Sequence, residues 1–244
     1  MPGMRGSEVR RTLLLALALA GCSAQPAPKA AEADVSGDPR HPKVVELFQS
    51  QGCSSCPPAN ANLNRVAGRG DLLALSFAVT YWDQLGWKDK FASPAFTQRQ
   101  WDYARAAGRG NVFTPQMIFN GSKVDVGGNP EVFDRIVHDL PALGGPAIDV
   151  AKGELVVGPG AAAKPATVWL VRYDPREQQV AIRAGENRGR TLPHRNIVTE
   201  LTNLGSWTGK ELRLPFPAGG DAALKTAVLL QSGPGGPLIG ARKL

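Results

Sequence analysis

Histidine, cysteine and methionine are scarce in this chain of 244 residues. The histidines His41, His138 and His194 are scattered, and a zinc site needs about four ligands at regular spacing. A copper-transfer site would need a histidine or methionine near its cysteines, and Met117 is the only methionine beyond the N-terminal segment. We therefore expect neither a metal site nor a cofactor.

The sequence also lacks an apolar run long enough to span a bilayer, which takes about 20 residues. The run at 12–20 is shorter, and it follows the positive charges of Arg5, Arg10 and Arg11. Such a pattern is typical of an export signal. The next residues, Leu-Ala-Gly-Cys ending at Cys22, resemble the lipobox of bacterial lipoproteins.

This resemblance implies a signal peptide at 1–21 that is cut before Cys22, whose acyl chains then hold the protein on a membrane. Ser23 in the next position resembles the outer-membrane sorting pattern, so we expect an exported, periplasmic protein. An ordinary secretory signal cut near Ala24 is the alternative. Residues 22–42 are rich in Ala and Pro without apolar periodicity, which predicts a flexible tether.

The formal net charge is +7, and it falls to about +5 without the signal segment, because three arginines and one glutamate are lost. Several arginines lie fairly close together at 183–195. A basic surface could touch anionic lipid, although a solvated face is the simpler interpretation. We expect no nucleic-acid partner for an exported chain without a stacking motif.

The most informative motif is Cys53-Ser54-Ser55-Cys56. It follows a strand-like run at 44–48 and precedes a helix-like segment that ends near Gly68. Pro57 and Pro58 are tolerated in the first turn of a helix, which places the helix start at Ser54 or Ser55. The positive end of the helix dipole then favours the thiolate of Cys53.

With this geometry Cys53 exchanges disulfides with a substrate and Cys56 resolves the mixed disulfide. This chemistry requires a solvent-accessible Cys53. A purely structural disulfide is the alternative, because exported proteins form such bonds readily.

Further elements follow the motif. We predict a buried parallel strand within 71–83, a helix at 94–107, a strand after Thr114-Pro115, a hairpin turn at Asn120-Gly121, an edge strand at 123–126 and a helix at 130–140. Aromatic residues at 81–103, Trp82 and Trp87 among them, either line a substrate groove or form the core of a helical insertion. An X-Pro before a strand resembles the cis-proline of thioredoxin-like proteins, which presents the preceding backbone to a bound peptide.

Three blocks, VVELFQSQGCSSCPPAN, TYWDQLGWKDKFASPAFTQRQWDYA and FTPQMIFNG, resemble the bacterial DUF1223 family of secreted thioredoxin-like proteins. The resemblance implies an α/β fold: a thioredoxin-like domain with an inserted helical segment at 43–142, then a β-rich C-terminal module at 143–244. It assigns Cys53 and Cys56 to the redox pair, Pro115 to the cis-proline and Glu46 to the buried acid that manages the proton of the second cysteine. The alternative for Glu46 is a surface glutamate.

The C-terminal half contains strand-like runs at 167–173, 179–183, 196–201 and 226–232. We expect an antiparallel sheet unit packed on the first domain. The glycines at 185–190 do not match a nucleotide-binding pattern, and His194 near Glu200 is interpreted as a turn histidine.

Two functions remain. The first is a membrane-tethered, extracytoplasmic thiol–disulfide oxidoreductase whose partners are protein thiols or disulfides. The second is a non-catalytic binding lipoprotein whose disulfide is a structural clip.

Overall fold

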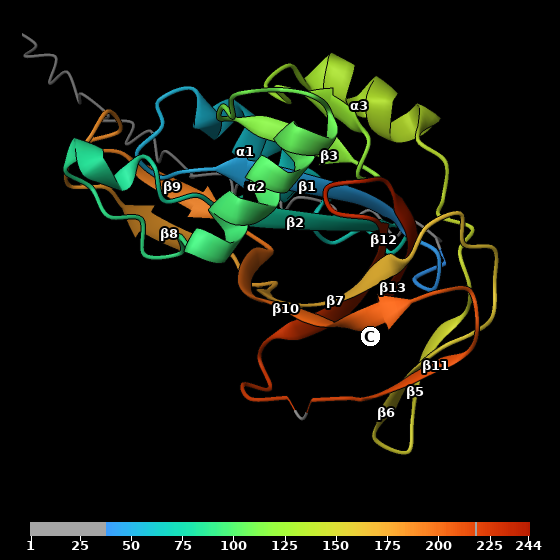
Figure 1. The fold of residues 1–244 in the computed structure, drawn as a ribbon. Helices are drawn as coiled ribbons and strands as arrows, with labels where there is room; N and C mark the ends of the chain where they lie inside the picture. The colour runs from blue at the N-terminus through green and yellow to red at the C-terminus, as the bar shows by residue number, and fades with distance from the viewer. Residues whose placement is uncertain (1–37, 218) are drawn as a thin grey trace, which may run out of the picture. The chain divides into compact units, whose positions relative to one another are not determined.

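An eight-stranded β-sheet runs through the computed structural model, which describes residues 38–217 and 219–244. The strand order is β13-β12-β7-β10-β2-β1-β3-β4. A three-stranded sheet, β11-β6-β5, and a two-stranded hairpin, β8-β9, accompany it (Figure 1). The predicted signal peptide, Cys22 and all but the last residues of the tether lie outside the described residues.

The elements of the first part are β1 (Lys43–Gln49), α1 (Cys56–Val66), β2 (Leu72–Ala78), the short 3₁₀ helix η1 (Asp83–Leu85), α2 (Pro94–Ala106), β3 (Gln116–Phe119), β4 (Lys123–Asp125) and α3 (Pro130–Asp139). The second part contains β5 (Ile148–Ala151), β6 (Glu154–Val157), β7 (Ala166–Asp174), β8 (Gln178–Ala181), β9 (Thr191–His194), β10 (Ile197–Trp207), β11 (Leu212–Pro215), β12 (Lys225–Ser232) and β13 (Leu238–Lys243).

Helices cover both faces of the sheet around β1. Side chains alternate along a strand, so Val45 and Leu47 pack with α1 and α3, while Val44 and Phe48 pack with α2. The β2 strand is buried along its whole length and runs parallel to β1, as its continuous apolar sequence predicts. The β3–β4 hairpin turns at Asn120 and Gly121, whose φ angles of 46° and 70° suit this turn.

The second half differs from the expected sheet unit packed on the first domain. The strand β10 pairs in parallel with β2, so β10, β7, β12 and β13 continue the same sheet. The three-stranded sheet contributes Leu155 and Val157 to a further apolar cluster with β7 and Trp207. The β-rich character of 143–244 is present, but one sheet crosses the predicted boundary between 142 and 143.

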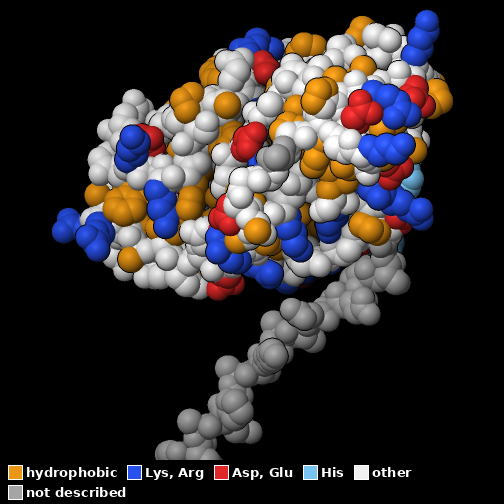
Figure 2. All heavy atoms as spheres, turned by 90° about the horizontal axis from the view of Figure 1, so that it is seen from below, with side chains coloured by type: hydrophobic (Ala, Val, Ile, Leu, Met, Phe, Trp, Pro, Cys, Tyr) orange, Lys and Arg blue, Asp and Glu red, His pale blue; other side chains and the backbone are white. Residues whose placement is uncertain are grey.

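Charges of both signs are mixed on the surface. Figure 2 shows one face, on which Lys and Arg side chains are interspersed with Asp and Glu and with apolar groups. Within the part of the chain that the structure describes, no helix is long and apolar enough to cross a membrane.

Candidate functional site

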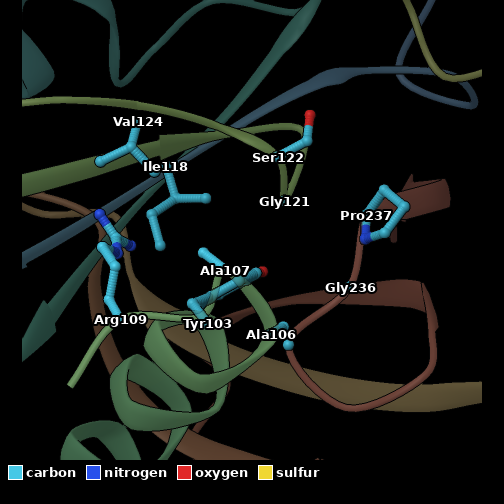
Figure 3. A pocket seen from close by; sticks show the side chains of 11 residues that line it. Tyr103, Ala106, Ala107, Arg109, Ile118, Gly121, Ser122, Val124, Gly236 and Pro237 are labelled. Carbon is cyan, nitrogen blue, oxygen red and sulfur yellow. The ribbon is translucent and has the colours of Figure 1, made fainter.

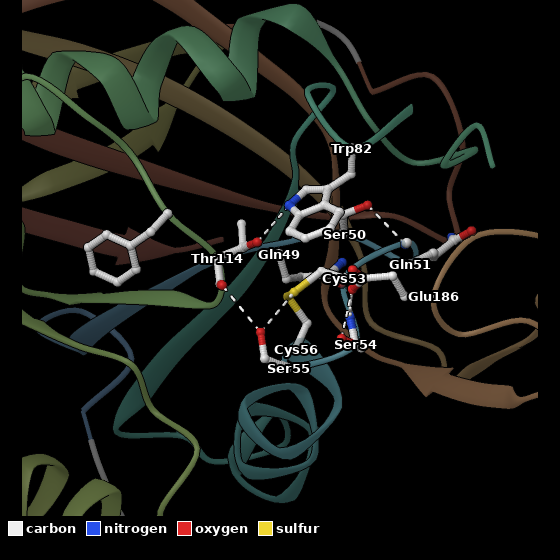
Figure 4. The surroundings of a disulfide bond; sticks show 12 residues. Gln49, Ser50, Gln51, Cys53, Ser54, Ser55, Cys56, Trp82, Thr114 and Glu186 are labelled. Atoms are coloured by element: carbon white, nitrogen blue, oxygen red, sulfur yellow. Dashed lines mark hydrogen bonds between the residues drawn. A yellow bond between two sulfur atoms is a disulfide. The ribbon is translucent and has the colours of Figure 1, made fainter. Parts of the chain in front are cut away.

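The candidate site is the disulfide between Cys53 and Cys56, which lies in the turn from β1 to α1 (Figure 4). Their Cα atoms are 5.4 Å apart. The helix begins at Cys56 with Ser55 as the N-cap, slightly later than the start predicted at Ser54 or Ser55. Pro57 and Pro58 occupy its first turn, where their missing N–H groups have no intrahelical partner to lose.

The segment that precedes β3 lies beside this turn. The Thr114–Pro115 peptide bond is cis. Ser55 Oγ lies 3.4 Å from Cys53 Sγ and donates a 3.4 Å hydrogen bond to the Thr114 carbonyl oxygen. Trp82 Nε1 donates to Thr114 Oγ1 at 2.7 Å. The structure therefore brings Thr114 and Trp82 together at the pair, as Figure 4 shows; their role as a substrate groove stays a prediction.

A second segment, from the C-terminal half, lies against the same turn. It comprises residues 185–190 between β8 and β9, and we call it the cover segment. Its Glu186 carboxylate accepts hydrogen bonds from the Ser54 amide at 3.0 Å and the Ser54 hydroxyl at 2.7 Å. These bonds lower the pKa of Glu186 below its usual value. The carboxylate is therefore ionised at neutral pH next to Cys53.

Asn187 fixes the cover segment to the backbone of the turn. Its side chain is fully buried, and Nδ2 donates to the carbonyl oxygens of Gln51 at 2.9 Å and Cys53 at 2.8 Å. Arg190 donates to Asn187 Oδ1 at 2.9 Å. Gly185 has a φ of +74°, a left-handed conformation that favours glycine, and it lies against Trp87.

The cysteine pair is buried beneath these contacts. Cys53 is 0% exposed and Cys56 is 2% exposed. The accessible Cys53 that the catalytic hypothesis requires is therefore not what the structure has. The sulfur of Cys53 becomes reachable for a substrate only when a neighbouring segment moves.

The loop after η1 supports the turn from another side. Buried Asp89 accepts a 2.8 Å hydrogen bond from the Gln51 amide, and its burial raises its pKa to about 6. Trp87 Nε1 donates to Gln51 Oε1 at 2.9 Å. The Trp87 ring packs with Phe91 against the β8–β9 hairpin. Trp87 thus joins the two halves of the chain near the pair.

Glu46 is not a surface residue, and it does not reach the cysteines. It is fully buried and pairs with Arg99 at 2.6 Å and with the Tyr103 hydroxyl, both on α2. Because α1 lies on the other face of β1, the sheet separates this carboxylate from Cys56. The role predicted for Glu46 in the proton chemistry of Cys56 is therefore wrong.

A neutral side chain lies on the cysteine side instead. Gln49 is two residues beyond Leu47 and so shares its face. It is 2% exposed and contacts Ser76 Oγ at 3.5 Å, and Figure 4 shows it beside the pair.

His194 is not a turn histidine. It is a β9 residue, 1% exposed, with its ring against that of Phe91. Burial lowers its pKa to about 4. Glu200 pairs with Arg172 at 3.2 Å.

A separate hollow of about 240 Å³ lies between α2, the β3–β4 turn and the 235–237 loop (Figure 3). Its lining includes Tyr103, Arg109 and Ile118 but neither cysteine. Among the residues described, no three His, Cys, Asp or Glu side chains are grouped to hold a metal ion.

The cysteine motif itself does not point to Glu186, Asn187 or Asp89. They lie far from the motif along the chain, and only the pairing of β10 with β2 brings the C-terminal half to the turn. The polar sequence at 185–190, which does not match a nucleotide-binding pattern, is the available signal for the cover segment.

The chain is similar to a protein family and to two solved structures. Residues 44–231 match the model of DUF1223, described as a protein of unknown function. Protein AGR_C_4864 from Agrobacterium tumefaciens, known from a crystal structure, has 33% sequence identity to this chain. The match covers 86% of this chain and 95% of that one, with a TM-score of 0.68. HBP35 of Porphyromonas gingivalis is 13% identical, with a TM-score of 0.56, and the match covers 85% of this chain and 76% of that one; it shows similarity of fold alone. No curated protein matches the chain.

Proposed function

The chain belongs to the DUF1223 family, and we propose that it is an extracytoplasmic, membrane-tethered thiol–disulfide oxidoreductase acting through Cys53 and Cys56. The observation that carries the proposal is the placement of the Cys53–Cys56 disulfide before α1, with the Thr114 backbone beside it. A purely structural clip needs no second backbone segment at the sulfur atoms.

The proposal includes a thioredoxin-like domain with an inserted helical segment at 43–142. The parallel β1–β2 pair, the disulfide between β1 and α1, and the Thr114–Pro115 segment before β3 support it. Export and lipidation at Cys22 are proposed from the sequence pattern alone.

In the exchange reaction, the two electrons that a client dithiol loses are gained by the Cys53–Cys56 pair. A client thiolate attacks Cys53 Sγ, forming a mixed disulfide and releasing Cys56 as a thiolate. A second client thiolate then attacks the client sulfur and releases Cys53. The client gains a disulfide and the pair gains two electrons, which another dithiol–disulfide protein must remove; client reduction is the reverse.

A trapping variant tests the proposal. Cys56→Ser leaves Cys53 without its resolving partner, so mixed disulfides with client proteins should accumulate on the full chain in cells. The matched control is the Cys53→Ser/Cys56→Ser double variant, which should trap nothing. Equal amounts of mixed disulfide in both variants would contradict the proposed oxidoreductase activity.

The second candidate is a binding protein with a structural disulfide. The full burial of Cys53 under the cover segment favours it. In that case Cys56→Ser traps no client, and loss of both cysteines lowers stability while a binding partner is retained.

A further inference from the structure

The carboxylate of Glu186 is hydrogen-bonded to the residue that directly follows Cys53, on which negative charge develops when the disulfide is reduced. Glu186 is 132 positions from Ser54, and it accepts both the amide and the hydroxyl hydrogen of that residue. Ser54 directly follows Cys53, and Figure 4 shows the Glu186 side chain beside the pair. A reduced Cys53 would therefore ionise next to a charge of the same sign.

The start of α1 offers this thiolate little compensation. Pro57 and Pro58 remove two amide hydrogens from its first turn, and the Cys56 amide donates to the Cys53 carbonyl at 3.2 Å. The Ser54 amide is taken by Glu186. The Ser55 hydroxyl donates to the Thr114 carbonyl oxygen and lies 3.4 Å from Cys53 Sγ, close enough to turn its hydrogen to a thiolate at that position.

Other charged groups near the turn have contacts of their own, and Arg188 of the cover segment is exposed to solvent. The Asp89 carboxylate accepts a hydrogen bond from the Gln51 amide, and the Asp89 amide donates to the carboxylate of Asp83, so both side chains here are acids. His194 on β9 is neutral at pH 7 because its pKa is about 4. Arg190 is directed to Asn187 and Lys90 lies over the Phe91 ring, 4.7 Å from its centroid.

We propose that Glu186 is a positioning residue that opposes the Cys53 thiolate and thereby stabilises the oxidised pair, so that the C-terminal half sets the redox balance of the cysteines. This inference rests on the proposed function, because the equilibrium between the disulfide and its reduced form affects function only in a pair that exchanges disulfides with other proteins. A nearby like charge disfavours ionisation, and solvent weakens this effect here because Glu186 is exposed. A thiol that ionises less readily makes its disulfide harder to reduce.

The test uses the reduced full-length protein. The alkylation rate of Cys53 by iodoacetamide is measured against pH, with peptide sequencing by mass spectrometry to separate Cys53 from Cys56 and Cys22. Glu186→Gln should increase the thiolate fraction of Cys53 about 3- to 10-fold at a pH below the midpoint. In glutathione buffers at a pH above the wild-type midpoint, two glutathione thiols reduce the pair to a Cys53 thiolate and a Cys56 thiol and release one proton to the buffer. The same variant should there shift the equilibrium toward the reduced pair by a similar factor.

Three variants separate charge from structure. Glu177→Gln, an exposed carboxylate at the other end of the β8–β9 hairpin, should change neither quantity. Ser55→Ala should shift the midpoint the opposite way, because the donor at the sulfur is lost. Asn187→Ala loosens the cover segment, so it should speed alkylation at every pH, including far above the midpoint, where Cys53 is already a thiolate and Glu186→Gln should have no effect.

The inference is overturned if Glu186→Gln changes the thiolate fraction below the midpoint less than twofold, or if Glu177→Gln changes it equally. These measurements use no client protein. They therefore give their answer even if Cys56→Ser traps nothing, and the two proposals can fail separately.

Discussion

Asn187 donates a 2.8 Å hydrogen bond to the carbonyl oxygen of Cys53, across 134 positions of sequence. The same amide group bonds to the Gln51 carbonyl, and the side chain is fully buried. The backbone of the cysteine turn is thus held by a residue of the C-terminal half.

Removing this contact should open the site. Asn187→Ala leaves the Gln51 carbonyl oxygen without its donor and the Cys53 carbonyl oxygen with the Cys56 amide alone, which costs about 1–3 kcal/mol. We expect dithiothreitol to reduce the disulfide about 5- to 30-fold faster, measured by thiol alkylation over time. The control Asn203→Ala, on an exposed part of β10, should not change the rate. An unchanged rate in Asn187→Ala would show that the cover segment does not limit access.

Strands, helices and the cysteine motif were predictable because each depends on nearby sequence. The continuous apolar run of β2 and the Asn120-Gly121 turn are local signals, and the structure agrees with both. The position of Glu46 was not predictable, because its face of the strand is fixed by a partner 53 positions away. The same reason applies to Glu186 and to the continuation of the sheet through β10.

The buried pair of Glu46 and Arg99 should support stability and not the cysteine chemistry. Glu46→Gln leaves the Arg99 charge buried without its ionised partner, and we expect a loss of about 3–5 kcal/mol in unfolding free energy. Urea denaturation measures the loss, and the control is Glu131→Gln, which changes an exposed side chain of α3. The alkylation midpoint of Cys53 should not move, and a clear shift would restore Glu46 as the acid of the site.

His194 should make the protein sensitive to acid. Its pKa is lowered from 6.5 to about 4 because burial disfavours the charged ring. The unfolded chain therefore binds this proton first, and the stability that the neutral ring allows above pH 6.5 is lost as the pH falls toward 4. The loss is roughly 3 kcal/mol.

The measurement compares wild type with His194→Leu by denaturation between pH 7 and 4. Asp89 has the opposite sign, because its raised pKa lowers stability as the pH rises through about 6. Subtracting the two curves removes this contribution. His138→Leu, at an exposed histidine, should keep the wild-type slope. Parallel wild-type and His194→Leu curves would contradict the burial of a neutral ring.

The most direct test of the proposed function is the reduction potential of the Cys53–Cys56 pair in the full-length protein. The protein is equilibrated in glutathione buffers, and the pair is read by alkylation and mass spectrometry. We expect a value between about −120 and −270 mV, the range of known exchange catalysts. A pair that stays oxidised below about −300 mV would contradict the account and identify the disulfide as a structural clip.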